Sequence, residues 1–394
     1  MKSYRLINPL LLFFILSVSC KDIGNRKSAS DDKHPVNQWS VIGPGGGGGV
    51  LKPAVSPFNE NFVMTHCDMT AAYVSHNGGQ SWKMKNLWNV PDDFEFDPVD
   101  SNRVYIATRG FLHSEDRGSG ISLLLMSEDR GESWKIIYPD ISGAKKVENI
   151  QSTSMMPSEL ISNAIDGTIQ KVEIDPADNS LIYLGIAPLI DYMGRGNTES
   201  VPDEVYVVAT SDHGQSWKRL ASLQGRKVLA IFPGISSDNV IVFSDKVCAW
   251  INKSTGEATT LPLPSERIIA IEGGMNGKGS IIYLQSPFRA GGKGGMFISN
   301  DMGKSWKQVN NGLSRESYKD MLPSFRQALA VCESKPEVAY ISTDFPRENA
   351  SGVFDPLYCI YKTEDAGENW LPVLVSSSFE GYLTKNFSGA WMEE

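Results

Sequence analysis

Apolar residues in this chain come in short runs, and each run is bounded by residues that favour turns. Four segments repeat one order of elements, in which an apolar strand leads through a polar, proline-containing or asparagine-containing turn into a second apolar strand. These segments are AVSPFNENFVMTHC at 54–67, FDPVDSNRVYIAT at 96–108, IDPADNSLIYLGIA at 174–187 and AVCESKPEVAYIST at 330–343. Helical periodicity is nearly absent, so the pattern predicts an all-β protein.

A second pattern, Ser/Thr-x-Asp-x-Gly-x-x-Trp, occurs five times, each time after an apolar run. The copies are SHNGGQSW at 75–82, SEDRGESW at 127–134, TSDHGQSW at 210–217, SNDMGKSW at 299–306 and TEDAGENW at 363–370, with Asn77 in place of the acid in the first. We expect a tight hairpin in which the Asp or Asn side chain caps backbone N–H groups and Gly adopts a left-handed conformation. The Trp then returns on the next strand and packs against a neighbour. Five copies indicate a repeat protein.

The repeated pattern resembles the Asp-box, also called the BNR repeat, of sialidases, sortilins, xyloglucanases and photosystem-assembly propellers. The resemblance implies a β-propeller in which each copy forms the outer hairpin of a blade, away from the active centre. The acids and Trp residues of the five copies are therefore expected to be structural. A sialidase is disfavoured because the Arg-Ile-Pro start of that family is missing.

The copies allow the chain to be divided into blades. Six can be counted, and the one at 228–262 lacks the Trp pattern. Their approximate limits are 51–88, 93–138, 170–223, 226–263, 267–310 and 327–375, with 139–169 as a long inserted loop. A strand from 36–46 could close the ring with the C-terminal segment, which would leave no free sheet edge. We therefore expect a single six- or seven-bladed propeller domain over 38–394; the alternative is a shortened relative of longer proteins with two propellers.

The N-terminus is typical of an export signal. Lys2 and Arg5 precede an apolar stretch that is too short to span a bilayer, and Cys20 follows small residues. The segment LSVSC resembles a bacterial lipobox, and the following Lys-Asp pair resembles the export tag of Bacteroidota surface lipoproteins. The resemblance implies a signal peptide over 1–19, a lipidated Cys20, a flexible stalk over 20–37 and an outer-membrane or periplasmic location. Simple secretion after cleavage elsewhere is the alternative.

Charge and cysteine usage narrow the range of partners. The formal net charge is −9, which disfavours nucleic-acid binding. The four cysteines besides Cys20 show no metal-ligand spacing, so we expect no metal and no cofactor, and burial as free thiols. The expected partners are a polysaccharide or oligosaccharide and, through the lipid anchor, a membrane. A monomer is expected.

Candidate site residues lie in the loops between the second and third strands of the blades. These loops point to the face opposite the Trp-pattern hairpins, and they differ most from blade to blade. The catalytic candidates are His66, Asp68, His113 and Tyr192, and the substrate-binding candidates are Arg109, Asp191, Arg195, Arg289, Asp344 and Arg347.

The segment 43–82 is similar to the start of the xyloglucanase propellers. That resemblance implies that Asp68, in HCDMTAAY, is a catalytic carboxylate. Thr70-Ala71 replace a Gly pair of the family, and the family's second acid lies in a second propeller that this chain lacks. Hydrolysis of a glycosidic bond needs two carboxyl groups, and Asp191 or Asp344 would be the second.

Two other functions fit the same face. Elimination from a uronic acid, by a polysaccharide lyase or an oligosaccharide dehydratase, would use His66 or His113 as base and Tyr73 or Tyr192 as acid. Arg109, Arg195 or Arg289 would neutralise the carboxylate of the sugar. The non-enzymatic alternative is a propeller that binds glycan or scaffolds an assembly. The candidate loops are richer in charged groups than in aromatic ones, which favours catalysis.

Overall fold

The computed structural model describes thirteen stretches of the chain, and all structural statements below concern these residues. They are 50–67, 71–87, 90–109, 111–112, 119–120, 122–140, 145–146, 160–161, 167–188, 203–289, 293–313, 328–348 and 354–375. Within these stretches the regular structure is entirely β, with no helix. The chain divides at Pro262–Leu263 into two compact units, which are described separately.

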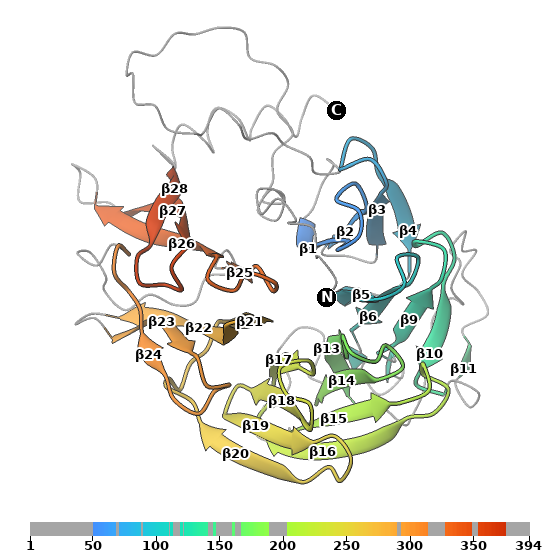
Figure 1. The fold of residues 1–394 in the computed structure, drawn as a ribbon. Coiled ribbons are helices and arrows are strands. Elements are labelled where there is room, and N and C mark those ends of the chain that lie inside the picture. The colour runs from blue at the N-terminus through green and yellow to red at the C-terminus, as the bar shows by residue number, and fades with distance from the viewer. Residues whose placement is uncertain are drawn as a thin grey trace, which may run out of the picture. The chain divides into compact units, whose positions relative to one another are not determined.

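The first unit contains four blades, each a four-stranded antiparallel sheet in which neighbouring strands follow the chain (Figure 1). The first blade consists of β1 (Val50–Val55), β2 (Val63–Cys67), β3 (Ala71–Ser75) and β4 (Lys83–Asn86), and the second of β5 (Pro91–Phe96), β6 (Val104–Thr108), β9 (Leu124–Ser127) and β10 (Lys135–Tyr138). The third consists of β13 (Thr168–Ile174), β14 (Ile182–Ala187), β15 (Glu204–Thr210) and β16 (Lys218–Gln224), and the fourth of β17 (Val228–Phe232), β18 (Asn239–Ser244), β19 (Val247–Asn252) and β20 (Ala258–Pro262).

The second unit contains two further blades of the same design. They consist of β21 (Ala270–Asn276), β22 (Gly279–Arg289), β23 (Lys293–Ser299) and β24 (Lys307–Gln308), and of β25 (Ala328–Val331), β26 (Ala339–Glu348), β27 (Phe354–Thr363) and β28 (Leu371–Val375). The described residues thus form the six blades of an all-β propeller, as predicted. The strand expected at 36–46 lies outside the described residues, and the single domain over 38–394 stays a prediction.

The insertion at 139–169 is more than a loop. Within it, β11 (Lys145–Lys146) pairs with β12 (Leu160–Ile161), and β12 pairs with β8 (Ser119–Gly120). A pairing of β8 with β7 (Phe111–Leu112) completes a small four-stranded sheet. The sequence did not reveal these strands because each spans only two residues, and because β12 pairs with β8 from 41 positions earlier in the chain.

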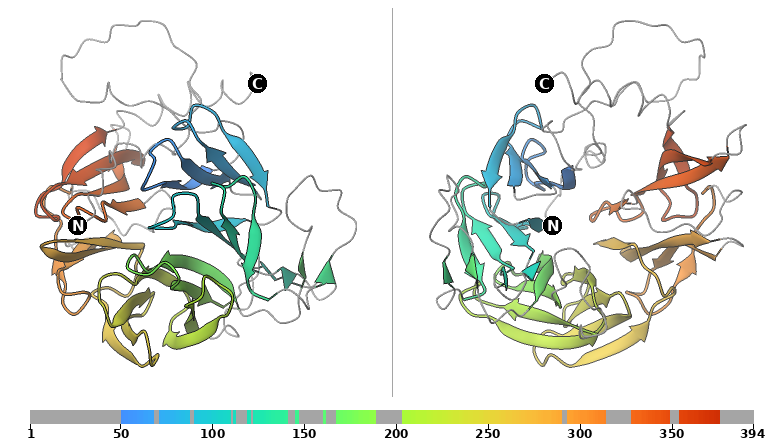
Figure 2. Two further views of the ribbon diagram at one scale, coloured as in Figure 1. Left: turned by 45° about the vertical axis from the view of Figure 1, so that its right-hand side comes forward. Right: turned by 180° about the vertical axis from the view of Figure 1, so that it is seen from behind.

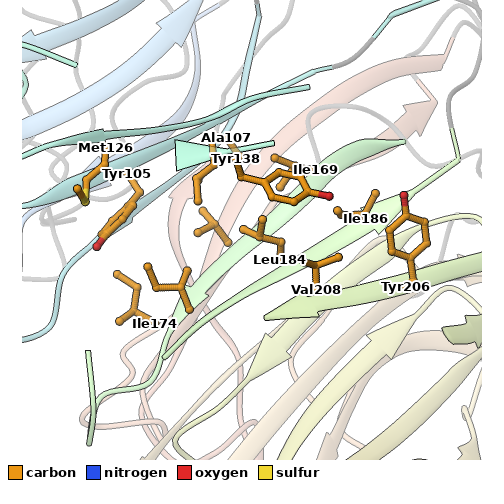
Figure 3. Packing of buried hydrophobic residues seen from close by; sticks show 13 residues of the cluster. Tyr105, Ala107, Met126, Tyr138, Ile169, Ile174, Leu184, Ile186, Tyr206 and Val208 are labelled. Carbon is orange, nitrogen blue, oxygen red and sulfur yellow. The ribbon is translucent and has the colours of Figure 1, made fainter. Parts of the chain in front are cut away.

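Apolar side chains between successive blades make the core. The blades of the first unit follow one another in chain order, and their first strands β1, β5, β13 and β17 contact in that order (Figures 1 and 2). Figure 3 shows the layer between the second and third blades, where Tyr105, Met126 and Tyr138 face Ile169, Leu184 and Val208. The core is therefore made by blades packing face against face.

Buried polar contacts also join the blades. Asp97, fully buried in the β5–β6 turn, accepts hydrogen bonds from Arg103 Nη1 at 3.2 Å and from Asn179 Nδ2 of the next blade at 3.0 Å. Asp175 holds the equivalent place in the third blade, and Lys253 Nζ of the fourth blade donates to its Oδ2 at 2.7 Å. Each of these carboxylates thus takes a partner from the following blade.

All five copies of the Trp pattern form the hairpin between the third and fourth strands of their blade. In the second blade, Asp129 Oδ1 accepts from Ser133 N at 2.8 Å and Ser127 Oγ accepts from Gly131 N at 2.7 Å. The pattern Gly has a positive φ in every copy, as expected, with φ 85° at Gly131. The residue before it is also left-handed, and in four copies it is not Gly: Arg130, His213, Met302 and Ala366.

Candidate functional site

Four charged or titratable side chains gather where the first and second blades meet, at the end of the sheets opposite the Trp-pattern hairpins. Lys52 lies in β1, His66 near the end of β2, Asp92 near the start of β5, and Arg109 directly after β6. We call these four residues the Asp92 cluster. His66 and Arg109 were expected here from the sequence, whereas Lys52 and Asp92 were not.

Asp92 is the centre of the cluster. Its residue surface is 9% exposed, and Nε and Nη2 of Arg109 both lie 3.0 Å from its Oδ1 atom. Lys52 Nζ lies 3.6 Å from the same oxygen and also donates to the backbone carbonyl of Asp92. One carboxylate therefore orients two cations that come from two different blades.

Lys52 reaches Asp92 from an unusual backbone conformation. Its φ is 48°, which a side-chain-bearing residue adopts at an energetic cost. The pairing of β1 with β2 shifts register between Leu51 and Ala54, so Lys52 sits at a bulge. The ion pair with Asp92 is a tertiary contact that holds this conformation.

His66 is buried, with 1% of its surface exposed, and its ring lies 5.9 Å from that of Phe94. Nδ1 is 2.7 Å from the carbonyl oxygen of Cys67. Because a carbonyl can only accept, Nδ1 carries the proton and Nε2 is left as an acceptor. Nε2 is buried and has no hydrogen-bond partner among the described residues.

Burial lowers the pKa of His66, and the nearby charges of Lys52 and Arg109 act in the same direction. The bond to Cys67 and the charge of Asp92 oppose this shift without overcoming it. The imidazole is therefore neutral near pH 7. With His66 neutral, the cluster holds two positive charges against one negative charge.

Tyr73 does not share a sheet face with His66. In the pairing of β2 with β3, Tyr73 is opposite Thr65, and His66 is opposite Ala72. Side chains alternate between the two faces of a strand, so Tyr73 and His66 point to opposite sides of the blade. Burial raises the pKa of Tyr73, which also bonds Cys67. The expected combination of these two residues as base and acid is therefore not assembled here.

The remaining predicted site residues fall into two groups. Three lie on strands of the second unit: Arg289 in β22 is in register with Lys293, and Asp344 and Arg347 in β26 are in register with Tyr358 and Asp355. The others lie outside the described residues: Asp68, His113, Asp191, Tyr192, Arg195 and the lipidation candidate Cys20.

A second unusual polar position lies on β22 in the second unit. Gln285 and Ser286 are almost completely buried, and Gln285 Oε1 and Ser286 Oγ lack hydrogen-bond partners in the described part of the chain. Among the described residues, no group of three or more His, Cys, Asp and Glu side chains is arranged to hold a metal ion. The described residues also contain no helix that is long and apolar enough to cross a membrane.

The curated proteins that this chain matches are xyloglucanases. No protein-family model matches the chain. A xyloglucanase from Paenibacillus sp is 25% identical over 233 residues, which is 56% of this chain and 19% of that protein. Xyloglucanase Xgh74A from Acetivibrio thermocellus is 28% identical over 201 residues, which is 47% of this chain and 19% of the relative.

A solved structure adds to the comparison at the level of the fold. The crystal structure of an ancestral GH74 enzyme matches 87% of this chain and 40% of its own, with a TM-score of 0.53 and 18% sequence identity. The chain spans about a fifth of the length of the curated relatives. In sequence it is similar to xyloglucanases over about half its length, and in structure it shares the propeller fold of a GH74 enzyme.

Proposed function

We propose that this protein cleaves glycosidic bonds of a polysaccharide or oligosaccharide, as part of a polysaccharide-degradation system. The observation that carries the proposal is the Asp92 cluster. It combines a neutral buried imidazole, a carboxylate and two cations at one end of the first two blades. Asp68, which the resemblance to xyloglucanases marks as a catalytic acid, follows His66 by two residues in the chain.

In this proposal Asp68 acts as the general acid or base. Asp191 or Asp344 supplies the second carboxyl group that glycoside hydrolysis requires. Asp92 is a poorer choice for that second group, because its Oδ1 atom already binds Arg109. Arg109, Arg195, Arg289 and Arg347 are proposed to contact the substrate.

Asp68→Asn tests the proposal. The exchange removes a proton-transfer group but keeps the size of the side chain, so turnover should fall by roughly 10²–10⁴-fold while the melting temperature is unchanged. Asp238→Asn is the matched control. Asp238 is exposed in the β17–β18 turn, at the opposite end of the blades, and should not affect turnover. Equal turnover of wild type and Asp68→Asn on every glycan cleaved would reject the role of Asp68.

Elimination is the second candidate, by a lyase or dehydratase acting on glycans that contain uronic acids. It is favoured by one observation: a neutral histidine, whose Nε2 atom has no hydrogen-bond partner within the described stretches, lies in the same cluster as two cations. His66 or His113 would remove the proton next to the sugar carboxylate, and Arg109 would neutralise that carboxylate. Hydrolysis produces new reducing ends alone, whereas elimination also produces the ultraviolet absorbance of an unsaturated uronate. His113→Ala, assayed beside Asp68→Asn, separates the two reactions.

The non-enzymatic alternative is a propeller that binds glycan or scaffolds an assembly. Wild-type protein that binds oligosaccharides but releases no product from neutral or acidic glycans would favour this alternative. We further propose that the five Trp-pattern hairpins are Asp-boxes, and that the chain is a monomeric lipoprotein anchored through Cys20 to the outer membrane. The sequence features described above support both proposals.

A further inference from the structure

We propose that the Asp92 cluster binds the carboxylate of an acidic sugar, so that the glycan recognised by this protein contains uronic acid. This inference rests on the proposed action on a glycan and specifies its substrate class. Two features of the described residues support it: the charge balance of the cluster and the orientation of its cations.

The charge balance favours an anion. Two cations surround one carboxylate, so the cluster carries a surplus of one positive charge in a chain whose formal net charge is −9. The surplus is also accessible from solvent. The side chains of Lys52 and Arg109 are 43% and 53% exposed, whereas that of Asp92 is 12% exposed. A ligand therefore meets the two cations rather than the carboxylate between them.

The two cations are held in place before any ligand arrives. Arg109 bonds Asp92 through Nε and Nη2, and its backbone N–H donates to the carbonyl of Val90 at 2.8 Å. Lys52 is fixed by its bond to the Asp92 carbonyl and by its position at the bulge in β1. Holding cations at fixed positions reduces the entropy lost on binding. A planar carboxylate is the group that an arginine side chain is best suited to bind.

His66 contributes through its charge state rather than by contact with the ligand. Its Nε2 atom is buried, and only 1% of the residue surface is exposed, so a ligand at the exposed ends of Lys52 and Arg109 does not reach it. Because the imidazole is neutral, Asp92 alone opposes the two cations within the cluster. Among sugars, a uronic acid carries the planar carboxylate that such a pair of cations binds.

The experiment compares binding of a uronic-acid oligosaccharide with binding of its carboxyl-reduced, neutral counterpart. The two probes differ only in the charged group. Calorimetric titration with the Asp68→Asn protein as the parent limits turnover during the measurement. We expect the acidic probe to bind at least about tenfold more tightly than the neutral one, and the difference to shrink as salt is added.

Two variants assign the preference to the cluster. Lys52→Gln and Arg109→Gln, each made in the parent, should weaken binding of the acidic probe by about tenfold and leave binding of the neutral probe nearly unchanged. Lys135→Gln is the control, since this lysine on β10 is 55% exposed and pairs with Glu128 on the hairpin. It should change neither affinity. Arg109→Lys should restore part of the lost affinity because it keeps the charge but not the planar fork.

Several results would overturn the inference. Equal affinity of the parent for the acidic and neutral probes would do so, as would unchanged binding by both glutamine variants. If Arg109→Gln lost affinity for the acidic and the neutral probe to the same extent, the cation would only maintain the fold. These outcomes leave the proposed cleavage to be judged by the turnover of wild type and Asp68→Asn. Conversely, selective acid binding without cleavage of any glycan would reject the enzymatic proposal and keep this one.

Discussion

Trp370 provides the most direct test of how the blades hold together. It is the largest fully buried side chain among the described residues, with 1% of its surface exposed. Its Nε1 atom donates to the carbonyl of Val309 in the preceding blade at 2.9 Å, and its ring meets that of Tyr283 edge-on at 6.3 Å. Trp370→Ala therefore removes apolar packing and an inter-blade hydrogen bond in the same step.

The cost follows from these contacts. Truncation of a fully buried Trp to Ala costs about 3–5 kcal/mol, and we expect a value near the upper end because the Val309 carbonyl also loses its donor. Trp134 is the comparison within the same pattern. It is only partly buried, and its Nε1 atom bonds Gly131 of its own turn rather than another blade. Trp134→Ala should accordingly cost about 1–3 kcal/mol.

Urea denaturation followed by far-ultraviolet circular dichroism measures both free energies. Trp370→Phe is a useful third variant, because it keeps most of the ring packing and removes the Nε1 donor. Its free energy of unfolding should be about 1–2 kcal/mol lower than that of the wild type. A cost for Trp370→Ala equal to or below that for Trp134→Ala would refute the reasoning, since burial and the inter-blade bond would then contribute nothing measurable.

Two further predictions concern pH and the N-terminus. Because the folded-state pKa of His66 lies below its usual value of 6.5, the unfolded chain binds a proton first as the pH falls. Stability should therefore be highest above pH 6.5 and decrease from there towards the lower folded-state pKa, and His66→Gln should reduce that decrease in urea midpoints measured from pH 7.5 to about pH 5. Burial also lowers the pKa of His76. Because His76 is still present in the variant, part of the loss of stability at low pH should remain. Cys20→Ser should move the protein from the membrane fraction to the soluble fraction; a variant that still sediments with membranes would rule out the anchor.

The blades could be predicted from sequence because their signals are local. Each Trp pattern contains its whole turn within eight residues, and the Pro-containing or Asn-containing turns mark the first two strands. The small sheet of β7, β8, β11 and β12 could not be predicted in this way. Its two-residue strands have no periodicity of their own, and Ile161 pairs with Gly120, 41 positions earlier in the chain.

The site was only partly predictable for the same reason. His66 and Arg109 stood out because polar residues followed apolar strands at the loop-rich end. Asp92 lies inside the strand PDDFEF, where nothing in the sequence indicates that its carboxylate meets a cation from 40 residues away. Lys52 depends on a bulge and a positive φ, which arise from the pairing of β1 with β2. Long-range pairing, rather than local preference, assembles the cluster.

The side-chain capping bonds of the Trp-pattern turns also bear on how far the blades can be exchanged. Because the capping bonds of such a turn stay within it, the capping scheme can be copied from blade to blade without new partners. The fourth blade has a different turn, in which Asn252 Oδ1 accepts from Ser254 N and Thr255 N. That turn carries Lys253, the partner of the buried Asp175 in the third blade. A graft of the Trp pattern at this position would leave a carboxylate buried without its cation. The missing copy is thus a constraint set by the neighbouring blade, and a chimera would have to replace Asp175 and Lys253 together.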